Sequence, residues 1–144
     1  MSASPNTTSV LPDPARAATG ALLDPRWGLA ACAAVVVGSL GPWASIGPFT
    51  TNGTSGDGVL TLVLAALAAT AIGLGRLLPG VAIAGGLVAL IALYDAVDIT
   101  SAGGVLDASP GWGVLLTAVA GIALTAWAVR ALRGRATGGT PSRP

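Results

Sequence analysis

The sequence of 144 residues contains no lysine, glutamate, histidine or glutamine, and its only cysteine is Cys32. The absence of histidine excludes imidazole acid–base catalysis, and with only one cysteine it also excludes most zinc sites. A single cysteine further excludes a CxxC redox pair and any disulfide within the chain. We therefore expect no enzymatic activity, no catalytic residue, no cofactor and no metal centre.

Charged side chains are also scarce, because seven arginines and six aspartates make up only 9% of the sequence. Soluble globular domains usually carry about 25% charged residues. Apolar residues account for 53% of this chain, and a chain this small has too large a surface to hide so many of them from water. The composition predicts an integral membrane protein whose partner is the lipid bilayer, with no nucleic-acid partner.

Four apolar stretches approach or reach the length of about 20 residues that a helix needs to cross a bilayer. They cover residues 27–46, 58–75, 79–97 and 111–129. We predict an all-α membrane protein in which four transmembrane helices form an antiparallel bundle within residues 26–132. The segment 1–25 is rich in Ser, Thr, Pro and Ala, and the tail 133–144 in Gly, Thr, Pro and Ser, so both are predicted to be disordered.

The arginines indicate the orientation of this bundle. Arg16 and Arg26 precede the first predicted span and Arg76 lies between the second and third. The remaining arginines follow the fourth span: Arg130, Arg133, Arg135 and Arg143. Because cytoplasmic loops retain positive charge, both termini are predicted to be cytoplasmic (N-in, C-in).

The aromatic residues suggest the same boundaries. Trp27 and Trp127 fall at the predicted cytoplasmic ends of spans, and the outer ends carry Trp43, Tyr94 and Trp112. Trp and Tyr favour the membrane–water interface because their rings are apolar with one polar group. We therefore expect these five side chains to form aromatic belts at the two interfaces.

Proline and capping signals indicate where helices begin and end. Pro42, next to Gly41, predicts a kink or an early end of the first helix, because proline lacks a backbone N–H and disfavours helical backbone before it. Asp57 is the predicted N-cap of the second helix, with its carboxylate accepting backbone N–H groups. Residues 109–110, Ser-Pro, are predicted to open the fourth helix as N-cap and first-turn proline.

Two further signals predict turns. Residues 76–80, Arg-Leu-Leu-Pro-Gly, predict a tight turn that makes the second and third helices an antiparallel hairpin. Asn52-Gly53 in the first outer loop is the strongest dipeptide signal for a type I′ turn and predicts a short β-hairpin there.

Small residues recur at helical spacing along every span. The stripes are Ala31, Ala34, Gly38, Gly41 and Ser45 in the first span; Thr61, Ala65, Ala69 and Gly73 in the second; Ala82, Gly85, Ala89, Ala92 and Ala96 in the third; and Gly113, Thr117, Gly121 and Thr125 in the fourth. Helices in lipid associate through close backbone contact and interhelical hydrogen bonds. We expect these stripes to face neighbouring helices.

Carboxylates supply the only candidates for chemistry. Asp95 and Asp98 lie three residues apart near the outer end of the third span, hence on one helical face, and with Asp57 and Asp107 they predict an acidic outer surface. Paired carboxylates can bind a hard cation or relay protons. The alternative is a structural role, in which Asp95 lies within a turn of the interface and reaches water or a loop.

A resemblance covers about a third of the chain. Residues 37–44 (VGSLGPWA) followed by residues 53–62 (GTSGDGVLTL) resemble a group of uncharacterised small four-span membrane proteins of high-GC actinobacteria. In that group GSxxPW ends the first helix and a GTxGDG loop leads into the second. The resemblance implies a plasma-membrane protein without a known activity, and it marks Pro42, Trp43 and Asp57 as candidate functional residues.

Two functions follow from these patterns. The leading prediction is a noncatalytic membrane protein that acts through helix packing, as a homo-oligomer or as a small partner in a larger membrane complex. The alternative is a transporter or channel for a small cation or protons that uses Asp95 and Asp98. Burial of Asp95 inside the bundle favours transport, whereas contact with a loop or headgroups favours a structural role.

Overall fold

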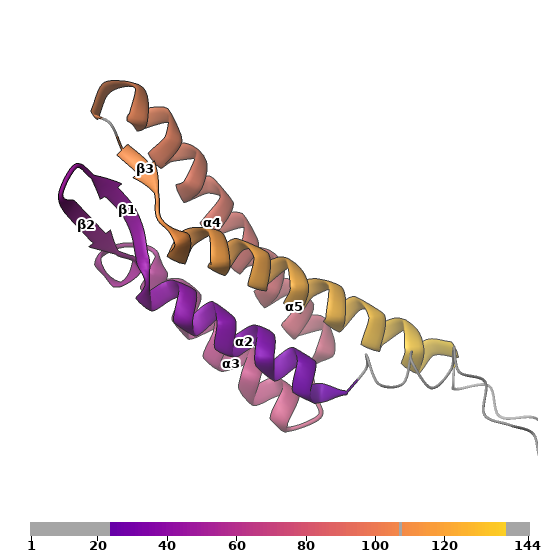
Figure 1. The fold of residues 1–144 in the computed structure, drawn as a ribbon. Coiled ribbons are helices and arrows are strands. Elements are labelled where there is room, and N and C mark those ends of the chain that lie inside the picture. Colours follow the sequence, from indigo (N-terminus) through magenta and orange to yellow (C-terminus); the bar gives the residue numbers. More distant parts are fainter. Residues whose placement is uncertain (1–23, 107, 138–144) are drawn as a thin grey trace, which may run out of the picture.

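The computed structural model describes residues 24–106 and 108–137, which form four α-helices and three short β-strands (Figure 1). The elements in chain order are α2 (Pro25–Leu40), β1 (Pro42–Ile46), β2 (Phe49–Asn52), the 3-10 helix η1 (Gly53–Ser55), α3 (Gly58–Gly73), α4 (Leu78–Leu106), β3 (Ala108–Pro110) and α5 (Trp112–Thr137). The predicted disorder in residues 1–23 and 138–144, and the acidic contribution of Asp107, lie outside the described residues.

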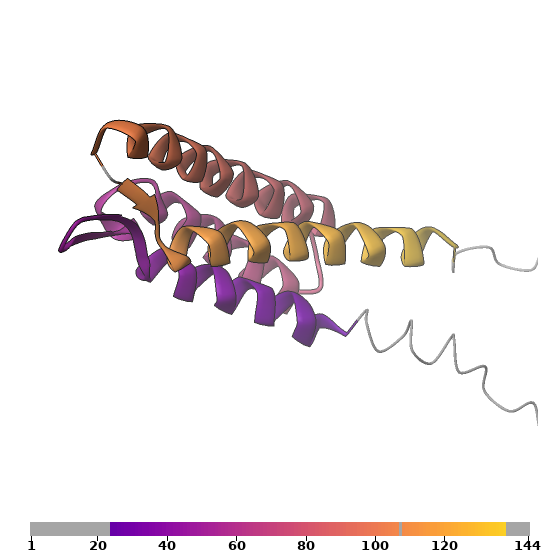
Figure 2. The ribbon, with the colours of Figure 1, turned by 45° about the horizontal axis from the view of Figure 1, so that its top comes forward.

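Successive helices run in opposite directions. Both ends of the described chain and the α3–α4 turn therefore lie at one end of the molecule, and the strands lie at the other (Figure 2). Within the bundle α2 packs between α3 and α5, and α4 packs against the same two helices. The four predicted helices are present in the described residues, but the prediction of an all-α protein is only partly correct, because three short strands form a sheet.

The lengths of the helices differ from the predicted spans. The helices α2 and α3 have 16 residues each, α4 has 29 and α5 has 26. At 1.5 Å per residue α2 and α3 are about 24 Å long, shorter than the hydrocarbon core of about 30 Å. By length and composition, two helices of the described chain are able to cross a membrane, over Leu78–Ser101 and Trp112–Ala136.

The first helix ends early, as Pro42 predicts. Its last residue is Leu40, and Gly41 already has extended backbone with φ −75° and ψ 174°. The chain then continues as the strand β1 and not as a kinked helix, so the predicted helical span 27–46 is wrong beyond Leu40. An apolar run of this length does not distinguish strand from helix by its periodicity.

The third and fourth helices are longer than predicted, because hydropathy marks where apolar residues stop and not where a helix stops. In α4 the hydroxyls of Thr100 and Ser101 donate to the carbonyl oxygens of Ala96 and Val97, at 2.6 and 2.8 Å. These bonds hold the polar side chains against the helix. Similarly, α5 extends to Thr137, which places the first residues of the predicted disordered tail in a helix.

The strands form one small sheet in the order β2-β1-β3, with both pairs antiparallel. A hairpin is present, but its two-residue turn is Gly47-Pro48, between the paired residues Ile46 and Phe49. Gly47 has φ +57°, which suits a type II′ turn because that turn needs a positive φ at its first central residue. The predicted turn at Asn52-Gly53 is wrong, since these residues end β2 and begin η1.

Capping also differs from prediction. Residues 109–110 belong to β3 and do not open α5, which begins at Trp112. Asp57 precedes α3 as predicted, but its side chain makes no capping hydrogen bond. The side-chain cap found in the described residues is Asp24, whose carboxylate accepts the N–H of Arg26 at 2.9 Å, with Pro25 at the first helical position.

The predicted helical hairpin of α3 and α4 is confirmed. After α3 the N–H of Arg76 donates to the carbonyl of Ala71 at 3.1 Å, and that of Gly75 to Ile72 at 3.0 Å. This pair of bonds, with Gly75 at φ +63°, is a Schellman motif that satisfies carbonyls at the end of the helix. Leu77 also has a positive φ of 58°, so the chain reverses within four residues.

Glycines bring the helices into backbone contact. A Cβ on Gly38 of α2 would lie 2.8 Å from the backbone nitrogen of Thr117, and one on Gly85 of α4 would lie 2.9 Å from that of Thr125. The predicted stripe of α5 therefore meets two partners, α2 near its start and α4 further along. Residues four apart rotate about 40° per step around a helix of 3.6 residues per turn, which carries the stripe from one neighbour to the other.

The same rotation explains why the predicted stripe of α3 is only partly correct. Thr61 and Ala65 are buried, but Ala69 is half-buried and Gly73 is exposed. The buried residues of α3 alternate three- and four-residue steps: Gly58, Thr61, Ala65, Ala68 and Ile72.

In α2 the buried residues are Gly28, Cys32, Val35, Gly38 and Ser39. Of its predicted stripe, Ala31, Ala34 and Ser45 are half-buried, while Gly38 and Gly41 are buried.

Candidate functional site

Charges in the described chain separate to the two ends of the bundle. The end with the α3–α4 turn carries Arg26, Arg76, Arg130, Arg133 and Arg135, and also Asp24, which caps α2 (Figure 2). The end with the strands carries Asp57, Asp95 and Asp98. Each end contains a cavity, and the two cavities differ in chemistry.

The cavity at the strand end has a volume of about 280 Å³ and lies between the β1–β2 hairpin, η1 and α4. We call it the acidic pocket, because its lining includes the carboxylates Asp57, Asp95 and Asp98 beside Trp43. Four of the five candidate residues, remote in sequence, are thus brought together. The fifth, Pro42, does not line this pocket, and its structural effect is to end α2.

The carboxylates of the acidic pocket differ in exposure. Asp57 and Asp98 are exposed, whereas Asp95 is half-buried and its Oδ2 is shielded from solvent without a hydrogen-bond partner in the described residues. A desolvated carboxylate oxygen is unfavourable unless it is paired, so the arrangement favours the approach of a proton or a cation. Within residues 24–106 and 108–137, however, no group of three Asp, Glu, His or Cys side chains is able to hold a metal ion.

The wall of the acidic pocket is fixed by Trp43, which is only 5% exposed. Its indole Nε1 donates to the carbonyl oxygen of Gly38 at 3.0 Å, and its ring joins a buried cluster with Ala92, Val114 and Ala118. Gly53 packs directly over this ring, where a Cβ would lie 2.5 Å from the carbonyl oxygen of Ser39. This close approach, not a turn conformation, explains the glycine at position 53.

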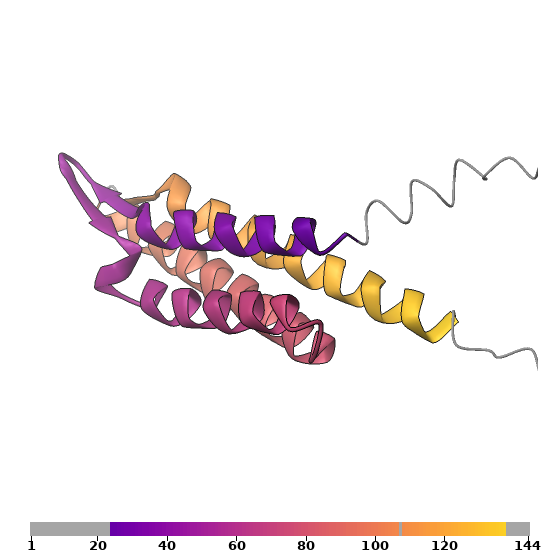
Figure 3. The same cartoon turned by 90° about the horizontal axis from the view of Figure 1, so that it is seen from below.

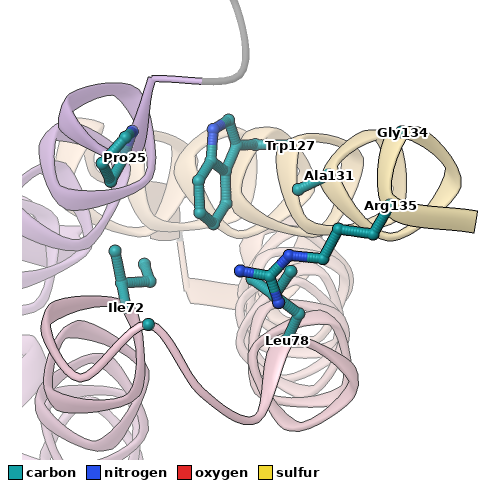
Figure 4. Close-up of a pocket in the computed structure, with 8 residues that line it drawn as sticks. Pro25, Ile72, Leu78, Trp127, Ala131, Gly134 and Arg135 are labelled. Atoms are coloured by element: carbon teal, nitrogen blue, oxygen red, sulfur yellow. The ribbon is translucent and has the colours of Figure 1, made fainter. Parts of the chain in front are cut away.

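The cavity at the arginine end also measures about 280 Å³ and lies among all four helices (Figure 4). We call it the basic-end pocket. Its walls are mainly apolar, from Pro25, Ile72, Leu78 and Trp127, and Arg135 is the charged residue that lines it. Trp127 is 8% exposed, and its Nε1 is buried without an acceptor in the described part of the chain.

The aromatic-belt prediction therefore needs correction. Trp27 and Trp112 are exposed near helix ends, where a bilayer interface would receive them. Tyr94 is also exposed, but it lies near the middle of α4 because this helix continues to Leu106. Trp43 and Trp127 are buried inside the bundle instead. Gly28 makes room for the buried ring of Trp127, because a Cβ at position 28 would lie 2.9 Å from the indole. The sequence alone does not show that this glycine packs against a ring 99 residues further along the chain.

Buried hydroxyls do not form a path through the bundle. The buried Thr117 and the half-buried Thr125 donate to carbonyls of their own helices, as expected for hydroxyls in helices. The buried hydroxyls of Ser39 and Thr61 bond to each other. Between the two pockets lies a cluster of buried apolar side chains: Val35, Ala65, Val88 and Ala120. In the described residues no chain of polar side chains links the acidic pocket to the arginine end.

No protein-family model matches this chain, and comparisons with curated proteins and with solved structures found no significant match.

Proposed function

We propose that this chain is a noncatalytic integral membrane protein that crosses the bilayer four times and acts through its helix faces, as a homo-oligomer or as a small partner in a larger membrane complex. The observation that carries the proposal is the distribution of side-chain size. Glycine, alanine, serine and threonine are frequent inside the bundle, while large apolar residues such as Leu67, Leu90 and Val119 point outward. Water disfavours such a surface, and lipid accepts it.

The short helix α2 is compatible with a full crossing because β1 extends it, and a bilayer accommodates the short helix α3 by local thinning. The helix α2 covers about 24 Å, and the five residues of β1 add about 16 Å at 3.3 Å per residue. The strand β1 is central in the sheet, so its backbone groups have partners on both sides. Backbone at membrane depth requires such pairing, which supports a strand as the outer part of a span.

The proposed orientation has the arginine end in the cytoplasm and the acidic pocket outside. Five arginines of the described residues lie at one end, and positive charge is retained on the cytoplasmic side. A plasma-membrane location and kinship with the actinobacterial group remain predictions from the sequence resemblance.

Cysteine labelling tests the topology. In a Cys32→Ala background, Phe49→Cys at the hairpin and Leu77→Cys at the α3–α4 turn supply exposed thiols. We expect an impermeant maleimide to label position 49 and not position 77 in intact cells, and both after lysis. Labelling of position 77 in intact cells, or release of the protein by alkaline carbonate, would contradict the proposal.

The partner prediction is tested in membranes. Chemical crosslinking followed by mass analysis of the purified complex should give either a discrete homo-oligomer or a second protein at fixed stoichiometry. A monomer without a stoichiometric partner at native expression would argue against function through helix packing.

A second candidate function is movement of protons or a small cation. It is favoured by the gathering of Asp57, Asp95 and Asp98 around one pocket and by the unpaired Oδ2 of Asp95. The apolar core beneath the pocket argues against it, and ion flux decides between the two functions.

A further inference from the structure

The basic-end pocket has the composition of a site for an amphipathic anion. Ile72 and Leu78 face Trp127 across the cavity, and the Arg135 guanidinium reaches into the space between them (Figure 4). No aspartate is among the residues that line it, and the Asp24 carboxylate nearby in the chain is engaged at the cap of α2. The pocket therefore combines one positively charged side chain, Arg135, with apolar walls.

We propose that the basic-end pocket binds the headgroup of an anionic phospholipid, with the phosphate at Arg135 and the glycerol region against Trp127, Ile72 and Leu78. This inference rests on the proposed membrane location. Basic pockets between transmembrane helices on the cytoplasmic side are suited to acidic headgroups, and guanidinium binds phosphate through charge-assisted hydrogen bonds.

The position of the pocket along the bundle fits this ligand. The helix α5 projects beyond the ends of α2 and α3 (Figure 3), and this overhang carries Arg135 past the last residues of the shorter helices. In the proposed orientation the level of Pro25 and Gly75 is the inner membrane–water interface. A lipid phosphate lies at that depth, whereas its acyl chains stay among the exposed leucines of the bundle surface.

The size of the pocket limits what enters. Ligand pockets start at about 300 Å³, and this one measures about 280 Å³, enough for a headgroup and glycerol but not for acyl chains. Trp127 contributes an apolar wall, because the six-membered edge of its indole points toward the cavity while the ring nitrogen lies on the side away from Ile72, Leu78 and Arg135 (Figure 4).

The test compares Arg135→Gln with the matched control Arg130→Gln, since Arg130 is an exposed arginine one and a half turns earlier on α5 that does not line this pocket. The protein and both variants are reconstituted in nanodiscs of phosphatidylcholine with one-fifth phosphatidylglycerol, and retained lipid is counted by native mass spectrometry. We expect one phosphatidylglycerol retained, a loss of retention of about tenfold in Arg135→Gln, and little change in Arg130→Gln.

Three outcomes would overturn the proposal. These are equal losses in the two variants, retention of phosphatidylcholine to the same extent, and displacement of the lipid by millimolar inorganic phosphate, which would assign the site to a soluble anion. Failure of the proposed membrane location is distinguishable, because the protein would then not enter nanodiscs at all. Trp127→Phe provides the second variant, with reduced retention expected from the smaller apolar wall.

Discussion

Ser39 of α2 and Thr61 of α3 place their hydroxyl oxygens 2.6 Å apart, fully buried between the strand-side ends of the two helices. Each hydroxyl also lies 2.8 Å from a carbonyl oxygen of its own helix, at Val35 and Gly58. The two hydroxyls have only two hydrogens to donate among these three oxygen–oxygen contacts. One hydroxyl therefore donates to the other across the interface, and the second donates to the carbonyl of its own helix. The short helices are thus joined by a polar contact that their apolar composition does not suggest.

Thr61→Val should weaken this contact without leaving a cavity, because valine has the shape of threonine. Ser39 keeps its bond to Val35, so no buried hydroxyl is left unpaired, and we expect a loss of about 0.6 kcal/mol, the average for interhelical hydrogen bonds in lipid. Thr70→Val is the control, since Thr70 is exposed and bonds only to Ala66. Unfolding free energies from denaturant titration in bicelles measure both, and equal values would remove the role assigned to the Ser39–Thr61 bond.

Two adjacent glycines of α4 give a sharper test of helix packing. A Cβ on Gly85 would lie 2.9 Å from the backbone nitrogen of Thr125, whereas nothing lies within 4 Å of one on Gly86. We expect Gly85→Ala to destabilise the bundle by about 1–3 kcal/mol through overpacking. Gly86→Ala should be neutral or stabilising by up to about 1 kcal/mol, because alanine favours helix more than glycine. The same bicelle assay applies, and similar effects at both positions would contradict the α4–α5 contact.

The sequence predicts the helical elements better than their ends. Apolar runs, the early stop before Pro42 and the turn near Arg76 are local signals, and each corresponds to an observed feature. In the strand β1, Ser45 pairs with Thr50, five residues along the chain, and with the distant Ser109. The turn dipeptide in this loop predicts a hairpin but misplaces its turn, whereas no local pattern indicates the pairing with β3.

In the candidate site, too, local features were predictable and contacts between distant residues were not. That Asp95 and Asp98 share a face with each other and an end with Asp57 is a consequence of helix geometry and antiparallel order, both of which the sequence indicates. The burial of Trp43 and Trp127 depends on Gly53 and Gly28, which approach the rings from other elements. Interface preference places tryptophan at the ends of spans, but it does not decide whether the ring faces lipid or the bundle.

Replacing the two buried tryptophans by phenylalanine separates their hydrogen bonding from their volume. Trp43→Phe removes the bond to the carbonyl of Gly38, whereas Trp127→Phe removes an N–H without an acceptor in the described residues. The loss of ring volume is the same, so in uncharged lipid we expect Trp43→Phe to be less stable than Trp127→Phe by about 1 kcal/mol. Thermal unfolding in phosphatidylcholine bicelles compares them, and a larger loss for Trp127→Phe would show that its N–H is already bonded.

Asp95→Asn distinguishes the structural role of the acidic pocket from transport. A proton or cation that enters at Asp95 meets a core of Val35, Ala65 and Val88 before the arginine end, and crossing about 30 Å of hydrocarbon requires further relay groups. We therefore expect vesicles with the protein or with Asp95→Asn to show the same proton and cation flux as protein-free vesicles. Removing a desolvated, unpaired charge near two other aspartates should also raise the unfolding free energy by about 1 kcal/mol. The exposed Asp98→Asn should change it less. Flux through the unmodified protein that disappears in Asp95→Asn would establish transport instead, and the packing role would fail.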